Sequence, residues 1–219
     1  MKKFNITVLF IFIITLGLKA QYLQDITGKP VFQLSYTDVQ GSQFLYDNWS
    51  NGSVVTAKGK TYDKVVLKYD NYNDKIYFKS ENGELLEFVD DIKSFTLQKD
   101  GLEKLYTKGF PEIDKFSLNT YFEVLFKGGN ILLLFKPYKY LTETKAYNSA
   151  TTEKKFVDNY AYYIFKIGKM EKFKPSKKEV LALFSDKSEQ VNGFIKSSNI
   201  DFKSNTDLAK VFDFYYSSK

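Results

Sequence analysis

Residues 121–135 read YFEVLFKGGNILLLF, the pattern of two β-strands joined by a tight turn. In the first half, Phe122, Val124 and Phe126 alternate with other residues and therefore share one face of a strand. The pair Gly128-Gly129 predicts a hairpin turn, because glycine adopts positive φ without steric cost. The second half, residues 130–135, is apolar on both faces, which is typical of a central strand covered on both sides. We therefore expect a sheet with further structure packed over its second face.

Around this hairpin the chain alternates between strand-like runs and turn residues. Residues 62–69 place Val65, Leu67 and Tyr69 on one face and lysines on the other, as in a half-buried strand. The dipeptide Asn82-Gly83 predicts another hairpin, because both residues tolerate positive φ. Residues 142–155 are polar and predict a loop, and residues 157–167 predict an aromatic strand. Shorter strands are expected at residues 31–34, 43–46, 53–57, 75–79, 85–89 and 92–97, and a strand or helix near 102–106.

The last part of the chain changes its period. Ser176 followed by Glu179 has the spacing of a capping box, which marks the start of a helix. Apolar residues then recur at helical spacing in three short runs, at residues 180–184, 191–195 and 208–215. These stripes need a partner surface, and the second face of the sheet is the natural candidate.

Together these patterns predict an α+β fold, a mostly antiparallel β meander in a curved or barrel-like sheet packed by short C-terminal α-helices. We expect residues 1–20 to be a signal peptide and residues 21–175 to be the antiparallel β region. Residues 176–219 are expected to form a helical C-terminal segment packed on the same domain. No fixed-length repeat or low-complexity linker suggests a further division.

The expected signal peptide has the usual order of a charged start, an apolar run and a small residue. Lys2 and Lys3 precede an uncharged run at residues 6–18, and Ala20 stands before Gln21. The run is shorter than the roughly 20 residues that a membrane helix needs, so we expect no transmembrane span in the mature chain. Loss of Lys2, Lys3 and Lys19 lowers the formal net charge from +6 to +3. We expect an exported protein, periplasmic or extracellular, and leave association with the outer membrane open.

The composition excludes several chemistries. The sequence has no Cys and no His, so it offers no thiol nucleophile, disulfide, thiolate metal site or imidazole base. All 32 basic residues are lysine, so no guanidinium fork recognises phosphate or guanine. With a weakly basic mature chain, we expect no nucleic-acid partner, and we predict no cofactor and no metal site.

The acidic residues leave two hypotheses to test. The turn at residues 70–74 is rich in oxygen ligands, but Tyr72 and Lys75 stand where a calcium loop needs a ligand and a glycine. The same Asp and Asn residues also suit a tight turn. Glycoside hydrolysis needs two carboxylates across a sugar, and no motif selects two acids here. Glu123 is the acid to inspect first, because it lies beside the expected central strand, and no catalytic residue is assigned.

Tyrosines and lysines supply the candidate binding surface. Aromatic faces stack on sugar rings, although strands also carry tyrosine because of its β-propensity. Lysines near the end of the β region could contact an anionic glycan, lipid headgroups or nucleic acid, or could simply cover a solvated strand edge. The candidate binding residues are Tyr72, Tyr77, Tyr138, Tyr140, Tyr160, Tyr162, Lys172 and Lys174.

One stretch also carries a resemblance. Residues 59–74, GKTYDKVVLKYDNYND, with the lone Trp49 upstream and VFDFYY at residues 211–216, resemble uncharacterised signal-bearing envelope proteins of Bacteroidota. The resemblance implies export to the envelope, and it implies no activity, cofactor or site residue.

The leading hypothesis is therefore a non-enzymatic binding or interaction protein of the cell envelope, with an envelope protein or a glycan as its partner. The alternative is a carboxylate-dependent envelope hydrolase acting on glycan. A small outer-membrane barrel fits less well, because lysines occupy many outward positions and the chain ends in helices. Two carboxylates in a deep cleft would favour the hydrolase, and a shallow aromatic concavity would favour the binding protein.

Overall fold

The structure, a computed structural model, describes residues 26–31, 36, 38–145 and 152–217. The expected signal peptide, residues 1–20, lies outside these ranges, and so does most of the strand expected at residues 31–34. The first strands are β1 (Gly28–Pro30), β2 (Val39–Gln40), β3 (Ser50–Thr56), β4 (Thr61–Asp70), β5 (Lys75–Lys79) and β6 (Leu85–Phe88). The later strands are β7 (Ile92–Lys99), β8 (Leu102–Thr107), β9 (Phe122–Gly128), β10 (Ile131–Lys145), β11 (Thr152–Lys166) and β12 (Lys169–Phe173). The helices are α1 (Lys177–Leu183), a 3₁₀ turn (Ser185–Lys187), α2 (Ser188–Ser197) and α3 (Asn205–Ser217).

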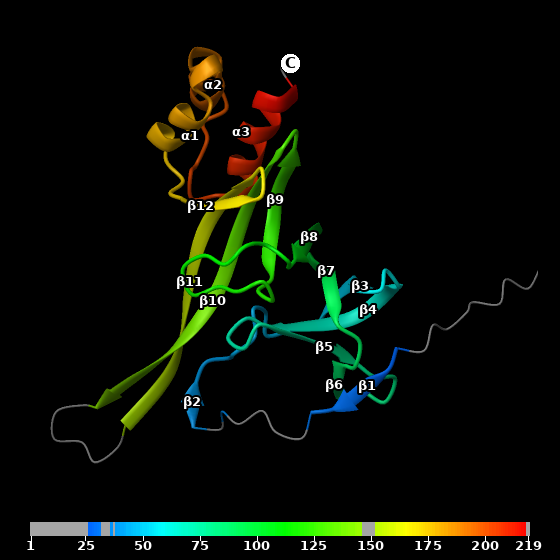
Figure 1. The fold of residues 1–219 in the computed structure, drawn as a ribbon. Coiled ribbons are helices and arrows are strands. Elements are labelled where there is room, and N and C mark those ends of the chain that lie inside the picture. Colours follow the sequence, from blue (N-terminus) through cyan, green and yellow to red (C-terminus); the bar gives the residue numbers. More distant parts are fainter. Residues whose placement is uncertain (1–25, 32–35, 37, 146–151, 218–219) are drawn as a thin grey trace, which may run out of the picture.

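The strands form one open, curved sheet with the order β1-β6-β5-β4-β3-β7-β8-β9-β10-β11-β12 (Figure 1). Neighbours along this path are antiparallel, and most follow each other in the chain, as in a meander. The short strand β2 lies off the path and pairs in parallel with β11. The described chain is therefore an α+β protein with a mostly antiparallel meander and helices near its C-terminus, as the sequence predicted.

The hairpin β9–β10 lies inside the sheet, and β10 is covered on both faces. β10 pairs with β9 on one side and with β11 on the other. Leu133 and Leu134 point to opposite faces, and both are fully buried. Leu133 belongs to the core beneath the helices, and Leu134 packs with Phe116 and Phe122 from the opposite side. The expectation of a central, doubly covered strand is confirmed.

The three helices gather at one end of the sheet, beside β9 and β12 (Figure 1). Val180, Val191 and Phe212 are fully buried against apolar residues of β10, β11 and β12. The predicted helix start is also confirmed, since Ser176 is the N-cap and its hydroxyl accepts the backbone N–H of Glu179 at 3.2 Å. The helices therefore use one face of the sheet as the partner surface that their apolar stripes require.

Two further cores complete the molecule. The curved strands β3 to β8 enclose a core that contains Leu67, Phe95 and Tyr106. The segment at residues 108–121 packs Phe110 and Phe116 on the face of β9–β11 that lies opposite the helices. Residues 114–116 of this segment border the candidate site.

Two sequence predictions were wrong in detail. Residues 142–145 and 152–155 are strand and not loop, since they extend the β10–β11 ribbon in register from Thr142↔Lys155 to Lys145↔Thr152. They are polar because both faces of this end of the ribbon are largely exposed, and Lys154 pairs with Glu143 across it at 3.2 Å. Residues 43–46 form only an isolated bridge, Phe44↔Asp70, in place of a strand.

Candidate functional site

A cleft of about 590 Å³ lies along one edge of β11, and we call it the tyrosine cleft. Its volume is within the range of roughly 300–1,000 Å³ that is usual for ligand sites. Five of the eight residues proposed from the sequence line it. They are Tyr138, Tyr160, Tyr162, Lys172 and Lys174. The full lining comprises residues 114–116, 138, 159–163 and 172–175.

The cleft forms where β11 lacks a second neighbour in the described part of the chain. On that edge, β12 pairs with β11 only as far as Tyr162↔Phe173, and β2 pairs only at Lys154 and Lys155. Residues 156–161 therefore present an edge without a strand beside it. The amide oxygen of Asn159 accepts the backbone N–H of Tyr160 at 2.8 Å and satisfies this outward-facing group.

Two tyrosines form the side of the cleft that faces the helices. Tyr160 and Tyr162 alternate along β11 and share a face with Phe135 of β10. Tyr162 is buried, and its hydroxyl donates to the side chain of Asn205 in α3 at 2.7 Å. Burial raises the pKa of Tyr162 to about 12. Tyr160 is 60% exposed, so its ring is available to a ligand.

The other side of the cleft belongs to the opposite face of the ribbon. Asp114 accepts hydrogen bonds from the hydroxyl of Tyr163 at 2.7 Å and from Lys172 Nζ at 3.1 Å. These two donors, Tyr163 first, hold the pKa of Asp114 below its usual value. Lys115 Nζ lies 3.9 Å from the centre of the Tyr138 ring and so covers part of its face. The cleft thus wraps around the edge of β11, with aromatic residues on both sides.

The other three sequence candidates lie elsewhere. Tyr77 is buried within the sheet at 4% exposure, and burial raises its pKa to about 12. Tyr72 is half-buried and packs edge-on against Tyr36 and Phe156. Tyr140 is 39% exposed and lies two residues beyond Tyr138 on β10, outside the cleft lining. Exposure and not residue type separates Tyr160 from Tyr77.

Sequence reasoning missed three polar members of the cleft, namely Asp114, Lys115 and Asn159. Asp114 and Lys115 sit in an irregular segment, and long-range packing of Phe116 on the ribbon brings them to the cleft. No local pattern reveals such a placement. Asn159 had a weak signal, since a polar amide beside tyrosines interrupts an otherwise aromatic strand.

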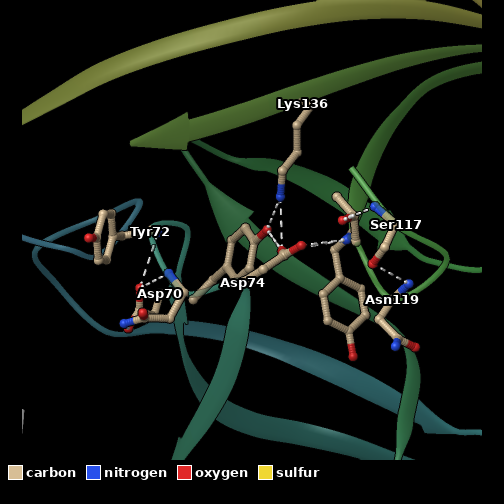
Figure 2. Close-up of polar contacts among 10 residues, drawn as sticks. Asp70, Tyr72, Asp74, Ser117, Asn119 and Lys136 are labelled. Atoms are coloured by element: carbon tan, nitrogen blue, oxygen red, sulfur yellow. Dashed lines mark hydrogen bonds and ion pairs between the residues drawn. The ribbon is translucent and has the colours of Figure 1, made fainter. Parts of the chain in front are cut away.

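The acidic turn at residues 70–74 is a structural feature. The buried carboxylate of Asp70 accepts the backbone N–H groups of Tyr72 at 3.1 Å and Asn73 at 2.8 Å, as well as the Asn73 side-chain amide at 2.8 Å. Figure 2 shows Asp70 and Tyr72 together at this turn. Burial raises the pKa of Asp70, and the bonds from Asn73 oppose that rise. Its oxygens serve the turn, as the tight-turn interpretation expects.

Asp74 ends this turn with φ of +59° and reaches a second polar cluster. Its carboxylate lies 2.9 Å from Lys136 Nζ, accepts the backbone N–H of Tyr121 at 3.2 Å and accepts the hydroxyl of Tyr69 (Figure 2). Lys136 is 2% exposed, and burial lowers its pKa while Asp74 opposes that change. The cluster joins the β4–β5 turn to β10 and supplies the partner that a buried ammonium group requires.

Glu123, the acid singled out from the sequence, is buried at 4% exposure. It accepts the hydroxyl of Tyr106 at 3.0 Å and lies 3.6 Å from Lys104 Nζ. Burial raises the pKa of Glu123, and Lys104 opposes the rise. Glu123 is not among the residues that line the tyrosine cleft, so it is not placed to act on a ligand there.

A second, smaller groove of about 350 Å³ contains several acids. Each of them has a lysine partner: Asp74 pairs with Lys136, and Asp91 with Lys108. Glu87 pairs with Lys29 and Lys75, and Asp90 with Lys58. Within the described residues, no group of three or more acids is placed to hold a metal ion. The tyrosine cleft is therefore the better candidate site.

No helix in the described ranges is long and apolar enough to cross a membrane. Comparisons with family models, with curated proteins and with solved structures found no match to this chain.

Proposed function

We propose that this protein is an exported, non-enzymatic binding protein that holds a glycan in the tyrosine cleft. The observation that carries the proposal is the convergence of Tyr138, Tyr160 and Tyr162 with Lys172 and Lys174 in one concavity. The C–H faces of sugar rings pack on aromatic rings, while amide and ammonium groups donate to sugar hydroxyls. The exposed Tyr160 ring, with Asn159 beside it on the strand, offers both kinds of contact.

The described lining of the cleft has too few acids for two-carboxylate hydrolysis, which favours binding. Among the described lining residues, Asp114 is the single carboxylate, and Tyr163 and Lys172 already hold it. Glycoside hydrolysis with two carboxylates needs a second acid about 5–10 Å away across the sugar. Because these two donors also keep its pKa low, Asp114 is poorly suited to act as a general acid.

Export is part of the proposal because of the sequence at the start of the chain. Residues 1–20 have two lysines near the start, then an uncharged apolar run, and a small residue at the end, in the order of a signal peptide. A cell-envelope location would place the protein beside the glycans that it binds.

The test measures binding of a panel of neutral and acidic oligosaccharides to the mature chain by calorimetry, together with release of reducing ends. We expect binding without turnover. Tyr160→Ala should weaken binding about tenfold, the equivalent of roughly 1.4 kcal/mol, because the exposed stacking surface is lost. Tyr140→Ala removes another exposed tyrosine of the same ribbon, outside the cleft, and should leave binding unchanged. Equal affinity of the two variants, or release of reducing ends, would refute the proposal.

A further inference from the structure

The charge of the tyrosine cleft is unbalanced. Its described lining contains three lysines, Lys115, Lys172 and Lys174, and one aspartate, Asp114. Only Lys172 forms a salt bridge with that aspartate, at 3.1 Å. Across the described ranges, neither Lys115 nor Lys174 has a salt-bridge partner. The cleft therefore carries a net charge of +2 beside an exposed aromatic ring.

The described lining of the second groove shows no such excess of lysine. In the second groove, the acids Asp74, Glu87, Asp90 and Asp91 each lie beside a lysine, so the charges largely cancel. Exposed lysines that lack an acidic partner attract anions, and a concave wall strengthens their field. Lys115 comes from the segment before β9, and Lys174 follows β12, so the two cations approach the cleft from different parts of the chain.

The edge of β11 also favours one of two kinds of anionic ligand, an acidic sugar over an acidic peptide. An acidic peptide could add as a strand only by pairing with free backbone groups. At Tyr160 the outward N–H is already bonded to the side chain of Asn159 at 2.8 Å. β12 and β2 further confine the open edge to residues 156–161. Recognition by side chains, as a sugar requires, needs no such backbone groups.

We propose that the ligand of the tyrosine cleft is an anionic sugar chain, whose carboxylate groups Lys115 and Lys174 bind while a sugar ring packs on Tyr160. This inference rests on the proposed function, and it adds the charge of the ligand.

The experiment compares three probes on the intact mature chain by calorimetry. They are an oligomer of galacturonic acid, the neutral galactose oligomer of the same length, and a glutamate-rich peptide. We expect the acidic sugar to bind more tightly than the neutral sugar at low ionic strength. The difference should shrink at high salt, because screening weakens the contribution of exposed charges.

Two variants locate the effect. Lys115→Gln and Lys174→Gln should each weaken binding of the acidic oligomer about threefold more than binding of the neutral oligomer, because the amide still donates to sugar hydroxyls but has lost the positive charge. Lys169→Gln removes an exposed lysine in the β11–β12 hairpin, outside the cleft, and is the matched control. All three positions are exposed, so the variants should fold, which circular dichroism checks.

The outcomes are distinct. Equal binding of neutral and acidic sugars overturns this inference and leaves the proposed glycan function standing. Tighter binding of the glutamate peptide overturns it in favour of a protein partner. If neither sugar binds, both proposals are wrong. If Lys169→Gln weakens binding as much as Lys115→Gln and Lys174→Gln do, the attraction belongs to the whole surface and the assignment to the cleft fails.

Discussion

At the scale of single residues, Lys136 is unusual because a lysine side chain is rarely buried. Its ammonium group is almost fully buried, and Asp74 and Tyr69 supply its partners. Removing one member of a buried ion pair leaves the other without compensation, which is more damaging than the loss of an exposed pair. Asp74 adopts positive φ, a conformation that Asn also tolerates, so its charge can be removed without changing the backbone.

Lys136→Met should lower the free energy of unfolding by about 3 kcal/mol, because Asp74 then loses its counter-charge. The double variant Lys136→Met with Asp74→Asn should recover part of this loss, since a neutral amide can still accept the N–H of Tyr121. Urea unfolding measures both changes.

The control for this prediction is Lys154→Met, which breaks the exposed pair with Glu143. It should cost less than about 1 kcal/mol. If Lys136→Met and Lys154→Met have equal effects, or if the double variant is less stable than Lys136→Met alone, the cluster does not act as a buried ion pair.

At the scale of elements, the helices and the sheet depend on each other through a few aromatic side chains. Phe212 of α3 is fully buried and contacts Phe126, Phe173 and Phe184. These partners come from β9, from β12 and from the end of α1, so one side chain joins three elements.

Phe212→Ala should lower the free energy of unfolding by about 3–5 kcal/mol, as expected for a large side chain removed from a packed core. Amide hydrogen exchange should show that α1, α2 and α3 lose protection together while β3 to β7 keep theirs. Uniform loss across both regions would contradict this separation. Tyr140→Ala, at an exposed position on β10, provides the control.

One substitution in the turn between β11 and β12 should make the protein more stable. Ile167 has φ of +50° and is 75% exposed, although β-branched residues are strained in this conformation. Gly168 follows with φ of +73°, and Asn-Gly is the preferred pair for such a turn. Ile167→Asn should therefore raise the free energy of unfolding by about 1 kcal/mol, measured by thermal or urea unfolding.

Val89→Asn is the matched control for this change. Val89 is also β-branched and is 59% exposed, but its φ is not positive. It should give no comparable gain. A similar gain at both positions would mean that removal of exposed apolar surface, and not relief of backbone strain, explains the effect.

Element patterns were largely predictable from the sequence, whereas contacts between distant segments were not. The run at residues 130–135 indicated a doubly covered strand, because no half-exposed strand needs apolar residues on both faces. Tyr138, Tyr160 and Tyr162 were proposed on residue type, and the pairing of β10 with β11 brings them into one cleft. Tyr77 could not be excluded, because in the sequence it alternates with Ile76 and Phe78 as an outward-facing residue does, whereas the folded sheet buries both faces of β5. Asp114 was missed because the packing of Phe116 against residues distant in the sequence brings it to the cleft.

At the scale of the whole molecule, the sheet has few paired residues where β8 meets β9. β8 and β9 pair only through Tyr106↔Glu123 and Thr107↔Phe122. The side chains of Tyr106, Glu123 and Lys104 form a buried polar contact at this junction. Ionisation of Glu123 therefore affects the point where the core of β3–β8 meets the strands that carry the cleft.

The pH dependence of the free energy of unfolding should reveal the ionisation of Glu123. Burial raises the folded-state pKa of Glu123, so the folded state holds its proton more tightly than the unfolded state. Its contribution is then fully present below the ordinary glutamate pKa of about 4.3 and is lost as pH rises through the raised folded value. Glu123→Gln cannot ionise, so its stability relative to wild type should improve as pH rises through this window. Urea unfolding at several pH values measures the difference.

Glu84→Gln, at an exposed position, is the control for this measurement. The assignment to Glu123 fails if both variants show the same pH response, or if the difference between Glu123→Gln and wild type moves in the opposite direction.

The long β10–β11 ribbon has a consequence for solubility. Beyond Phe135, β10 no longer pairs with β9, and an unpaired strand edge invites other chains to add and aggregate. Pro137 follows at this point and has no N–H to donate, and the next N–H on that side, from Lys139, already bonds to the carbonyl of Asn71. On the other edge, Asn159 bonds to the N–H of Tyr160. The ribbon can therefore project from the sheet while these positions resist edge-to-edge growth into fibrils.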